Sequence, residues 1–317
     1  MLALPAPAGS PAMTRLIATL MLLVTTMLWG FAFVAQKSAT HLMGPFTFSA
    51  VRYALGTIVI LPLVLWEIRR REPTPIARRD WLLIAVLGLS FFLGVYFQQA
   101  GLGTTTVTNG GFLTSLYVLL VPLIALVVAR QLPHPIVWLC MPIAILGVFL
   151  LNGGHLDRFN VGDLLVIIGA VFWAIQVLLI GQLARSTGLP VTVTVICFAV
   201  TAVLSTAGAL VFESPTIASF GPAWVEILYA GILSTAVAFT LQAIGQQDVP
   251  PANAAIILSA ESLFAALGGA LVLGERLPPI GYLGAALIFV AIITVETAPS
   301  LFRRRSTPPT GLVADAD

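Results

Sequence analysis

Long uncharged stretches constrain this chain more than any other feature of its sequence. The 317 residues include a run between Asp80 and Arg130 that contains no Asp, Glu, Lys or Arg, and similar gaps recur along the chain. Charged residues make up only 9% of the sequence, whereas hydrophobic residues make up 59%. So few polar side chains cannot cover the surface of a water-soluble globule. The sequence therefore predicts an integral membrane protein.

The uncharged stretches divide into segments of the length that a membrane helix needs. A helix takes about 20 apolar residues to cross the hydrocarbon core, and charged or turn-forming clusters separate ten such segments. A barrel of β-strands is disfavoured, because it would show alternating segments of about ten residues instead of continuous apolar runs. The division is least distinct at residues 101–111, where no charge marks the turn. The predicted spans cover approximately residues 14–35, 46–66, 81–101, 106–129, 135–152, 162–182, 190–212, 223–245, 251–273 and 279–297.

Basic residues set the predicted orientation of these spans. With the N-terminus in the cytoplasm, eleven arginines fall on the inner side, and only Lys37, Arg158 and Arg276 fall on the outer side. The positive-inside rule favours this arrangement, so both termini are predicted to be cytoplasmic. Only one of the fifteen basic residues is lysine, a bias that favours a GC-rich bacterial genome and hence the bacterial inner (plasma) membrane. Basic loops explained in this way require no nucleic acid.

The second half of the chain repeats the first. The segment around Trp29 returns around Trp173, Gln99 has a counterpart in Gln242, and similar motifs end at Pro133 and Pro278, all about 144 positions apart. The predicted units are a five-helix repeat at residues 14–152 and a second at residues 153–298, with disordered tails at residues 1–13 and 299–317; either Met1 or Met13 can be the start. An odd number of spans inverts the second repeat in the membrane. The predicted fold is therefore an all-α membrane protein of ten transmembrane helices in two inverted five-helix repeats, which is the architecture of secondary transporters.

Four stretches of the sequence carry a resemblance to a known family. They read "LWGFAFVAQK", "GPFTFSAVRY", "TSLYVLLVPLIALVVARQLP" and "LSAESLFAALGGALVLGERL". Together with the repeat and the number of spans, they resemble the EamA family of ten-span permeases in the drug/metabolite transporter superfamily, over residues 15–297. The resemblance implies export of amino acids, related metabolites or drugs through a cavity between the halves. Two positions depart from the family's pattern: Gln131 replaces a frequent Glu after the fourth span, and Ser262 replaces a Pro that often follows the Glu of the ninth span.

Glu261 is a carboxylate at membrane depth with no cation near it in the sequence. It precedes Glu275, at the end of the same span, by fourteen residues, or roughly 21 Å along a helix, so it lies near the middle of the membrane. A carboxylate there must face a polar cavity, share a hydrogen-bond network or be protonated. Two interpretations remain open: a site for a substrate amine or a coupling proton, or a carboxyl held by Ser259, Ser262 or a neighbouring helix that never titrates.

Other polar or aromatic residues within the spans are candidates for the same cavity. Arg52, in the second span, either extends to the outer headgroups or balances a substrate carboxylate. The repeat pairs Gln99 with Gln242 and Trp29 with Trp173, which makes a symmetric lining plausible. For the tryptophans ordinary packing is the favoured interpretation, and for the glutamines packing and cavity lining are equally open. The predicted lining consists of Trp29, Arg52, Gln99, Tyr117, Trp173, Gln242 and Glu261.

Motifs for catalysis or metal binding are missing from the sequence. It contains no H-E-x-x-H, G-x-S-x-G or Walker motif and no cysteine cluster, so we expect neither an enzyme nor a cofactor or resident metal. The predicted function is export of amino acids or related small metabolites by alternating access, with proton antiport as a candidate coupling. The alternatives are an exchanger of phosphorylated metabolites or nucleotide sugars from the same superfamily, and a channel-like permease. The expected partners are a small-molecule substrate and the lipid bilayer, and the protein is expected to be a monomer or a homodimer.

Overall fold

A computed structural model describes residues 15–70, 75–128, 130, 132–151, 153–154, 160–276 and 278–305. Within these ranges the chain is helical apart from turns and short loops, and no strand occurs in them. Among the described residues, nine helical segments are long and apolar enough to cross a membrane, and a tenth, Pro135–Leu151, is shorter. Large apolar side chains such as Leu82, Leu210 and Leu271 are exposed on the outer surface of the bundle, as a protein embedded in lipid requires. Gln131, Arg158, the predicted tail at residues 1–13 and the part of the predicted tail 299–317 beyond residue 305 lie outside the described residues.

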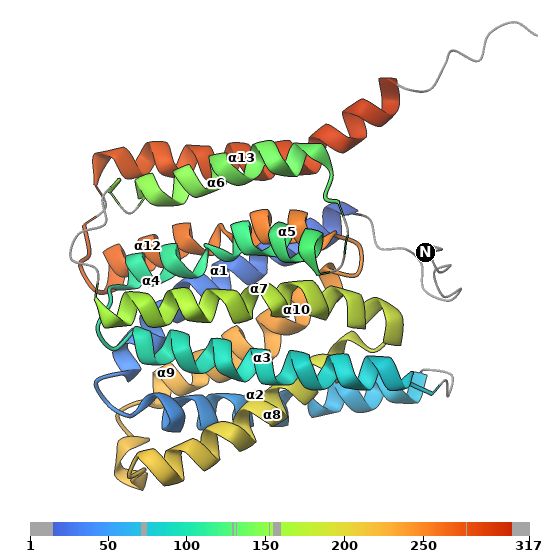
Figure 1. Cartoon of the computed structure of the whole chain (residues 1–317). Coiled ribbons are helices and arrows are strands. Elements are labelled where there is room, and N and C mark those ends of the chain that lie inside the picture. The colour runs from blue at the N-terminus through green and yellow to red at the C-terminus, as the bar shows by residue number, and fades with distance from the viewer. Residues whose placement is uncertain are drawn as a thin grey trace, which may run out of the picture.

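The ten predicted spans correspond to ten helical segments that lie side by side (Figure 1). The last helix continues to Arg305, past residue 298. A short 3₁₀ turn, Ile217–Ser219, precedes the eighth segment. The first repeat consists of α1 (Arg15–Ala39), α2 (Pro45–Arg70), α3 (Arg78–Gly101), α4 (Val107–Thr114), α5 (Tyr117–Val127) and α6 (Pro135–Leu151). The second consists of α7 (Val161–Thr187), α8 (Pro190–Phe212), α9 (Trp224–Leu228), η2 (Tyr229–Ala238), α10 (Phe239–Gly245), α11 (Pro251–Leu258), α12 (Glu261–Val272) and α13 (Pro279–Arg305).

The fourth and ninth spans are each broken at the same point of the repeat. In α4 and α5 the break lies at Ser115, and in α11 and α12 it lies 144 positions later, at Ser259. At each break the chain makes a tighter turn: Val118 N donates to Ser115 O at 3.0 Å, and its counterpart Ser262 N donates to Ser259 O at 3.1 Å. Such interruptions are tolerated at membrane depth only inside the protein. The two spans that the sequence predicts here are confirmed as membrane-length segments, Val107–Val127 and Pro251–Val272, and the tighter turns within them contain no Gly or Pro that would mark them in the sequence.

A reciprocal pair of carboxylates shows that the repeats are inverted. Glu67, near the end of α2, accepts hydrogen bonds from Val191 N (3.0 Å) and Thr192 N (2.7 Å) in the first turn of α8. Glu213, just after α8, accepts from Phe46 N (2.9 Å) and Thr47 N (2.8 Å) in the first turn of α2. The two helices therefore run antiparallel, and each carries a carboxylate that caps the other. The two caps lie at opposite ends of the bundle, as an inverted repeat requires.

We expect Glu67→Gln and Glu213→Gln each to lower the stability of the protein by about 2 kcal/mol, because each carboxylate forms charged hydrogen bonds to otherwise unpaired helix N–H groups. Thermal unfolding in detergent, followed by intrinsic fluorescence, measures the effect. Glu226→Gln is the matched control, since no hydrogen bond of the Glu226 side chain occurs within the described part of the chain. Equal midpoints for all three variants would show that the caps contribute nothing.

Two cations repeat the same symmetry and mark the ends of the bundle. Lys37, in the last turn of α1, donates to Leu102 O at 2.8 Å, just after α3. Arg185, in the last turn of α7, donates to Gln246 O at 2.9 Å, just after α10 and 144 positions beyond Leu102. Lys37 therefore lies at a helix end, where it caps a carbonyl. We call the end where α1 begins the terminal end of the bundle, and the other the distal end.

A central cavity between the two repeats

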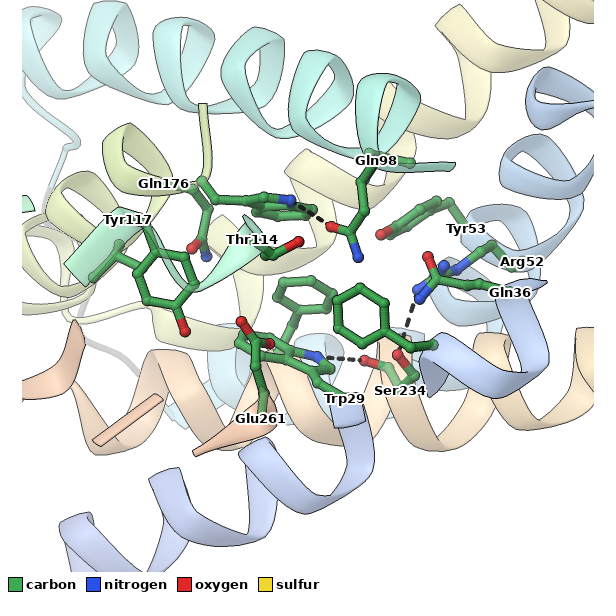
Figure 2. A pocket seen from close by; sticks show the side chains of 15 residues that line it. Trp29, Gln36, Arg52, Tyr53, Gln98, Thr114, Tyr117, Gln176, Ser234 and Glu261 are labelled. Atoms are coloured by element: carbon green, nitrogen blue, oxygen red, sulfur yellow. Dashed lines mark hydrogen bonds between the residues drawn. The ribbon is translucent and has the colours of Figure 1, made fainter. Parts of the chain in front are cut away.

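A cavity lies between the repeats (Figure 2). Its walls come from both halves of the chain, including α1, α2 and α3 from the first and α7, η2 and α12 from the second. It reaches from the breaks in the fourth and ninth spans toward the distal end, where Gln36 is three residues from the end of α1. The lining residues are Trp29, Phe33, Gln36, Arg52, Tyr53, Val95, Gln98, Thr114, Tyr117, Trp173, Gln176, Val177, Ser234, Phe239 and Glu261.

The cavity lies on the axis that relates the two repeats. Residues at equivalent positions of an inverted repeat meet in space only close to that axis. Four pairs of lining residues are 144 positions apart: Trp29 with Trp173, Phe33 with Val177, Val95 with Phe239, and Tyr117 with Glu261. Three of the pairs are aromatic or aliphatic, and only the fourth differs in charge. The walls are thus nearly symmetric, and the polar groups are not.

Glu261 begins α12, immediately after the break in the ninth span. Its side chain is 3% exposed and lines the cavity. The carboxylate oxygen Oε1 and the hydroxyl of Tyr117, which faces it in Figure 2, interact with each other, and neither forms a hydrogen bond with any other described residue. The two neighbouring serines do not hold it, because Ser259 donates to Ile256 O and Ser262 donates to Ser259 O, both at 2.7 Å.

A close helix crossing fixes the position of this carboxylate. Helix α1 packs against the start of α12 at Gly30. A methyl group at Gly30 would lie 2.2 Å from Cβ of Phe264 and 2.7 Å from the carbonyl oxygen of Glu261. Only glycine therefore allows the two backbones to approach this closely. The contact holds Glu261 beside Trp29, the preceding residue of α1.

Arg52 is a buried cation in the same cavity. Its side chain is 3% exposed, and its guanidinium lies 4.8 Å from the ring centre of Tyr53. Its hydrogen bonds are long, at 3.4 Å to the hydroxyls of Thr235 and Ser234. The ion pair between Arg15 and Glu296 is the single one formed by the described side chains, so no carboxylate among them pairs with Arg52. The guanidinium therefore faces the cavity, and we find it buried within the bundle and not at its surface.

The two tryptophans form an aromatic wall between these charges. Trp29 donates from Nε1 to Ser234 O at 3.1 Å, and Trp173 donates to Gln98 Oε1 at 2.5 Å. Both rings pack on Phe239, with ring centres 4.5 Å and 5.9 Å away. The polar atoms of the tryptophans are thus satisfied, and their ring surfaces are presented to the cavity. Ser234 belongs to η2, a π-helical segment, which is a frequent feature of functional sites.

Gln99 and Gln242 lie outside the lining, although the sequence placed both in it. Gln99 donates to Gln36 O at 3.1 Å, and Gln242 exchanges two hydrogen bonds with Gln176, at 2.8 and 3.2 Å. Gln98, one position earlier, is the residue that faces the cavity. Each residue turns a helix by about 100°, so an error of one position in the repeat moves a side chain to another face. The lining residues that sequence reasoning missed are Phe33, Gln36, Tyr53, Val95, Gln98, Thr114, Gln176, Val177, Ser234 and Phe239.

The described residues contain no group of three or more His, Cys, Asp or Glu side chains that could hold a metal ion. The two cysteines, Cys140 and Cys197, are buried free thiols. Within the cavity, Glu261 is the single carboxylate and Arg52 the single basic side chain of the lining. The lining therefore offers one positive and one negative group to a ligand, with an aromatic surface between them.

Comparison with known proteins agrees with this architecture. A model of the EamA-like transporter family matches residues 16–153 and again residues 160–297. An uncharacterized transporter of Archaeoglobus fulgidus is 32% identical over 289 residues, covering 91% of this chain and 88% of the relative. The threonine/homoserine exporter RhtA of Escherichia coli is 27% identical over 270 residues, covering 80% of this chain and 83% of that protein. A solved crystal structure that is 22% identical superimposes with a TM-score of 0.70 over 92% of this chain and 99% of the other, which supports the fold. The chain therefore belongs to the EamA-like transporter family, within the drug/metabolite transporter superfamily.

Proposed function

We propose that this transporter exports amino acids by alternating access, in exchange for protons. One observation carries the proposal: Arg52 and Glu261, which have opposite charges, are both buried and line the same cavity. Neither forms an ion pair with another described side chain. The similarity to RhtA, a threonine/homoserine exporter, agrees with it.

An amino acid has the charges that complement this cavity. At neutral pH it carries a carboxylate and an ammonium group, and burying an unpaired charge in a membrane protein costs several kcal/mol. A guanidinium binds a carboxylate through two parallel hydrogen bonds, which assigns the substrate carboxylate to Arg52. Glu261 then takes the ammonium group. The aromatic wall formed by Trp29, Trp173 and Phe239 receives the rest of the molecule.

The inverted repeat provides the route across the membrane. The cavity extends toward the distal end, and the two repeats have similar walls in opposite orientations. If the repeats exchange conformations, the same site extends toward the terminal end instead. With both termini in the cytoplasm, these two states face outward and inward.

The charge of Glu261 suggests how export is driven. When the amino acid leaves, Glu261 is a buried anion without a partner, and binding a proton neutralises it. Arg52 remains charged, and Tyr117 is the other titratable group that faces Glu261. Substrate and proton therefore compete for Glu261, and one proton enters for each amino acid that leaves. The empty, protonated carrier has one more positive charge than the loaded carrier, so the membrane potential drives export too.

A phosphorylated substrate fits the cavity poorly. A phosphate monoester carries close to two negative charges. In the lining only the guanidinium of Arg52 would attract it, and the carboxylate of Glu261 would repel it. An efflux screen separates the two functions. Cells that overproduce the protein are loaded with amino acids and with sugar phosphates, and the medium is followed by mass spectrometry. We expect several-fold faster appearance of amino acids than in cells with empty vector, and loss of the difference on adding an uncoupler. Selective release of phosphorylated solutes would overturn the proposal.

The orientation can be tested by labelling cysteines at the two ends of the bundle. Ala77 precedes α3 at the terminal end, and Gly221, where an added Cβ would meet no atom within 4 Å, precedes α9 at the distal end. In a protein with Cys140 and Cys197 replaced by Ala, Gly221→Cys should react in intact cells with a thiol reagent that cannot cross the membrane. Ala77→Cys should react only with a permeant reagent. The reverse pattern would place both termini outside.

A further inference from the structure

Three buried oxygen atoms line the cavity at the two helix breaks, and none of them is hydrogen-bonded to a described group outside the three. They are Oγ1 of Thr114, the last residue of α4, the hydroxyl of Tyr117, the first residue of α5, and Oε1 of Glu261, the first residue of α12. Each side chain is 2–3% exposed and lines the cavity. Figure 2 shows Tyr117 and Glu261 next to each other and Thr114 nearer the centre of the view, with no hydrogen bond drawn to any of them.

These oxygens need an explanation, because leaving a buried polar atom without a hydrogen bond lowers the stability of the protein by about 1–3 kcal/mol. Hydroxyls in membrane helices commonly bond back to a carbonyl of the preceding turn, as Ser115 does to Gly111 O at 2.9 Å. Thr114, its neighbour, does not. Tyr117 can satisfy Glu261 only in part, so three oxygens that share one cavity and have no partner in the rest of the described protein indicate a ligand that supplies hydrogen-bond donors.

We propose that Thr114, Tyr117 and Glu261 together form the site for the primary ammonium group of the substrate. The inference rests on the proposed function and adds two residues that determine specificity. A primary ammonium has three N–H donors and no acceptor, and the site offers three oxygens, of which one is anionic. A hard metal ion is a poorer match, because Ca²⁺ and Mg²⁺ surround themselves with six or more oxygens.

The site predicts discrimination at the amino group of the substrate. An N-methyl amino acid keeps its charge but has two donors, so one oxygen stays unpaired. An N-acetyl amino acid has one donor and no positive charge. The cavity should therefore bind amino acids in the order unmodified, N-methyl, N-acetyl, whatever their side chain.

The test is competition in proteoliposomes that contain the purified protein. Alanine, threonine, leucine and phenylalanine are each compared with their N-methyl and N-acetyl derivatives as inhibitors of exchange of the labelled parent. The parent should bind about tenfold more tightly than its N-methyl derivative, the effect of one hydrogen bond to a charged group. In Tyr117→Phe and Thr114→Val the parent should bind about tenfold less tightly, and the difference between parent and N-methyl derivative should disappear.

Thr201→Val is the matched control. Thr201 is buried, and its hydroxyl also has no partner within the described ranges, but it does not line the cavity. This variant should discriminate as the wild type does. If wild-type protein exchanges amino acids but accepts N-methyl derivatives equally well, the ammonium site is wrong while the proposed function stands. Exchange that depends on Na⁺ and is lost in Tyr117→Phe for all derivatives alike would assign the three oxygens to a metal ion instead. If none of the four amino acids is exchanged, the proposed function itself fails.

Discussion

Glu261→Gln should abolish export driven by a proton gradient. Glutamine keeps the shape of the side chain but can neither release a proton nor neutralise an ammonium group. Losing a charged hydrogen bond weakens binding by about 1.5–3 kcal/mol, or roughly 10- to 100-fold. We expect no accumulation of amino acid against its gradient in proteoliposomes, whereas slow exchange between equal concentrations can continue. Export by the wild type should be faster into an acidic medium than into an alkaline one, and the residual exchange of the variant should not depend on pH.

Glu226→Gln controls for loss of a carboxylate outside the cavity, and it should export as the wild type does. Transport by Glu261→Gln with unchanged rate, pH dependence and response to an uncoupler would mean that Glu261 is a buried structural group. That outcome would remove the basis for proton exchange.

Arg52→Gln should remove the site for the substrate carboxylate. The guanidinium packs on Tyr53 and forms two long hydrogen bonds, so most of its hydrogen-bonding capacity is left for a ligand. A bidentate pair with a carboxylate is among the stronger hydrogen-bonded contacts, and its loss should weaken amino-acid binding about 100-fold. Arg52→Lys keeps the charge without the planar fork and should retain part of the affinity.

Comparing the affinities of two ligands separates an effect on substrate binding from an effect on folding. Phenethylamine has no carboxylate, so its weak binding should be the same in wild type and Arg52→Gln, whereas phenylalanine should bind far more weakly to the variant. An equal loss for both ligands would indicate damage to the fold, and no loss for either would place the substrate carboxylate elsewhere.

The fold could be predicted largely from charge spacing and the repeat. Membrane spans must lack charges, so the gaps between charged residues located ten helices, and an offset near 144 with five spans in each half required inversion. The family and the fold class are both confirmed. The breaks at Ser115 and Ser259 could not be predicted, since both sequences favour helix locally and the interruption arises from tertiary packing.

The site was harder to predict because it depends on helix register. Charges at membrane depth are costly and therefore conspicuous, which identified Arg52 and Glu261. Neutral residues such as Thr114 and Ser234 are inexpensive to bury and gave no signal. An offset of 144 applied without variation would have pointed to Gln98 in place of Gln99, and would have paired Tyr117 with Glu261 at the axis.

The central claim is that the cavity binds a zwitterion between Arg52 and Glu261. It is tested most directly by exchange of labelled amino acid in proteoliposomes, with three kinds of competitor. Unlabelled phenylalanine is compared as a competitor with its decarboxylated analogue phenethylamine and its deaminated analogue 3-phenylpropionate. Leucine is compared with its own decarboxylated and deaminated analogues in the same way. We predict that the amino acids compete and that each single-charge analogue competes only at a roughly 100-fold higher concentration, since each leaves one buried charge unpaired. Competition by either analogue at concentrations similar to the amino acid would contradict the claim.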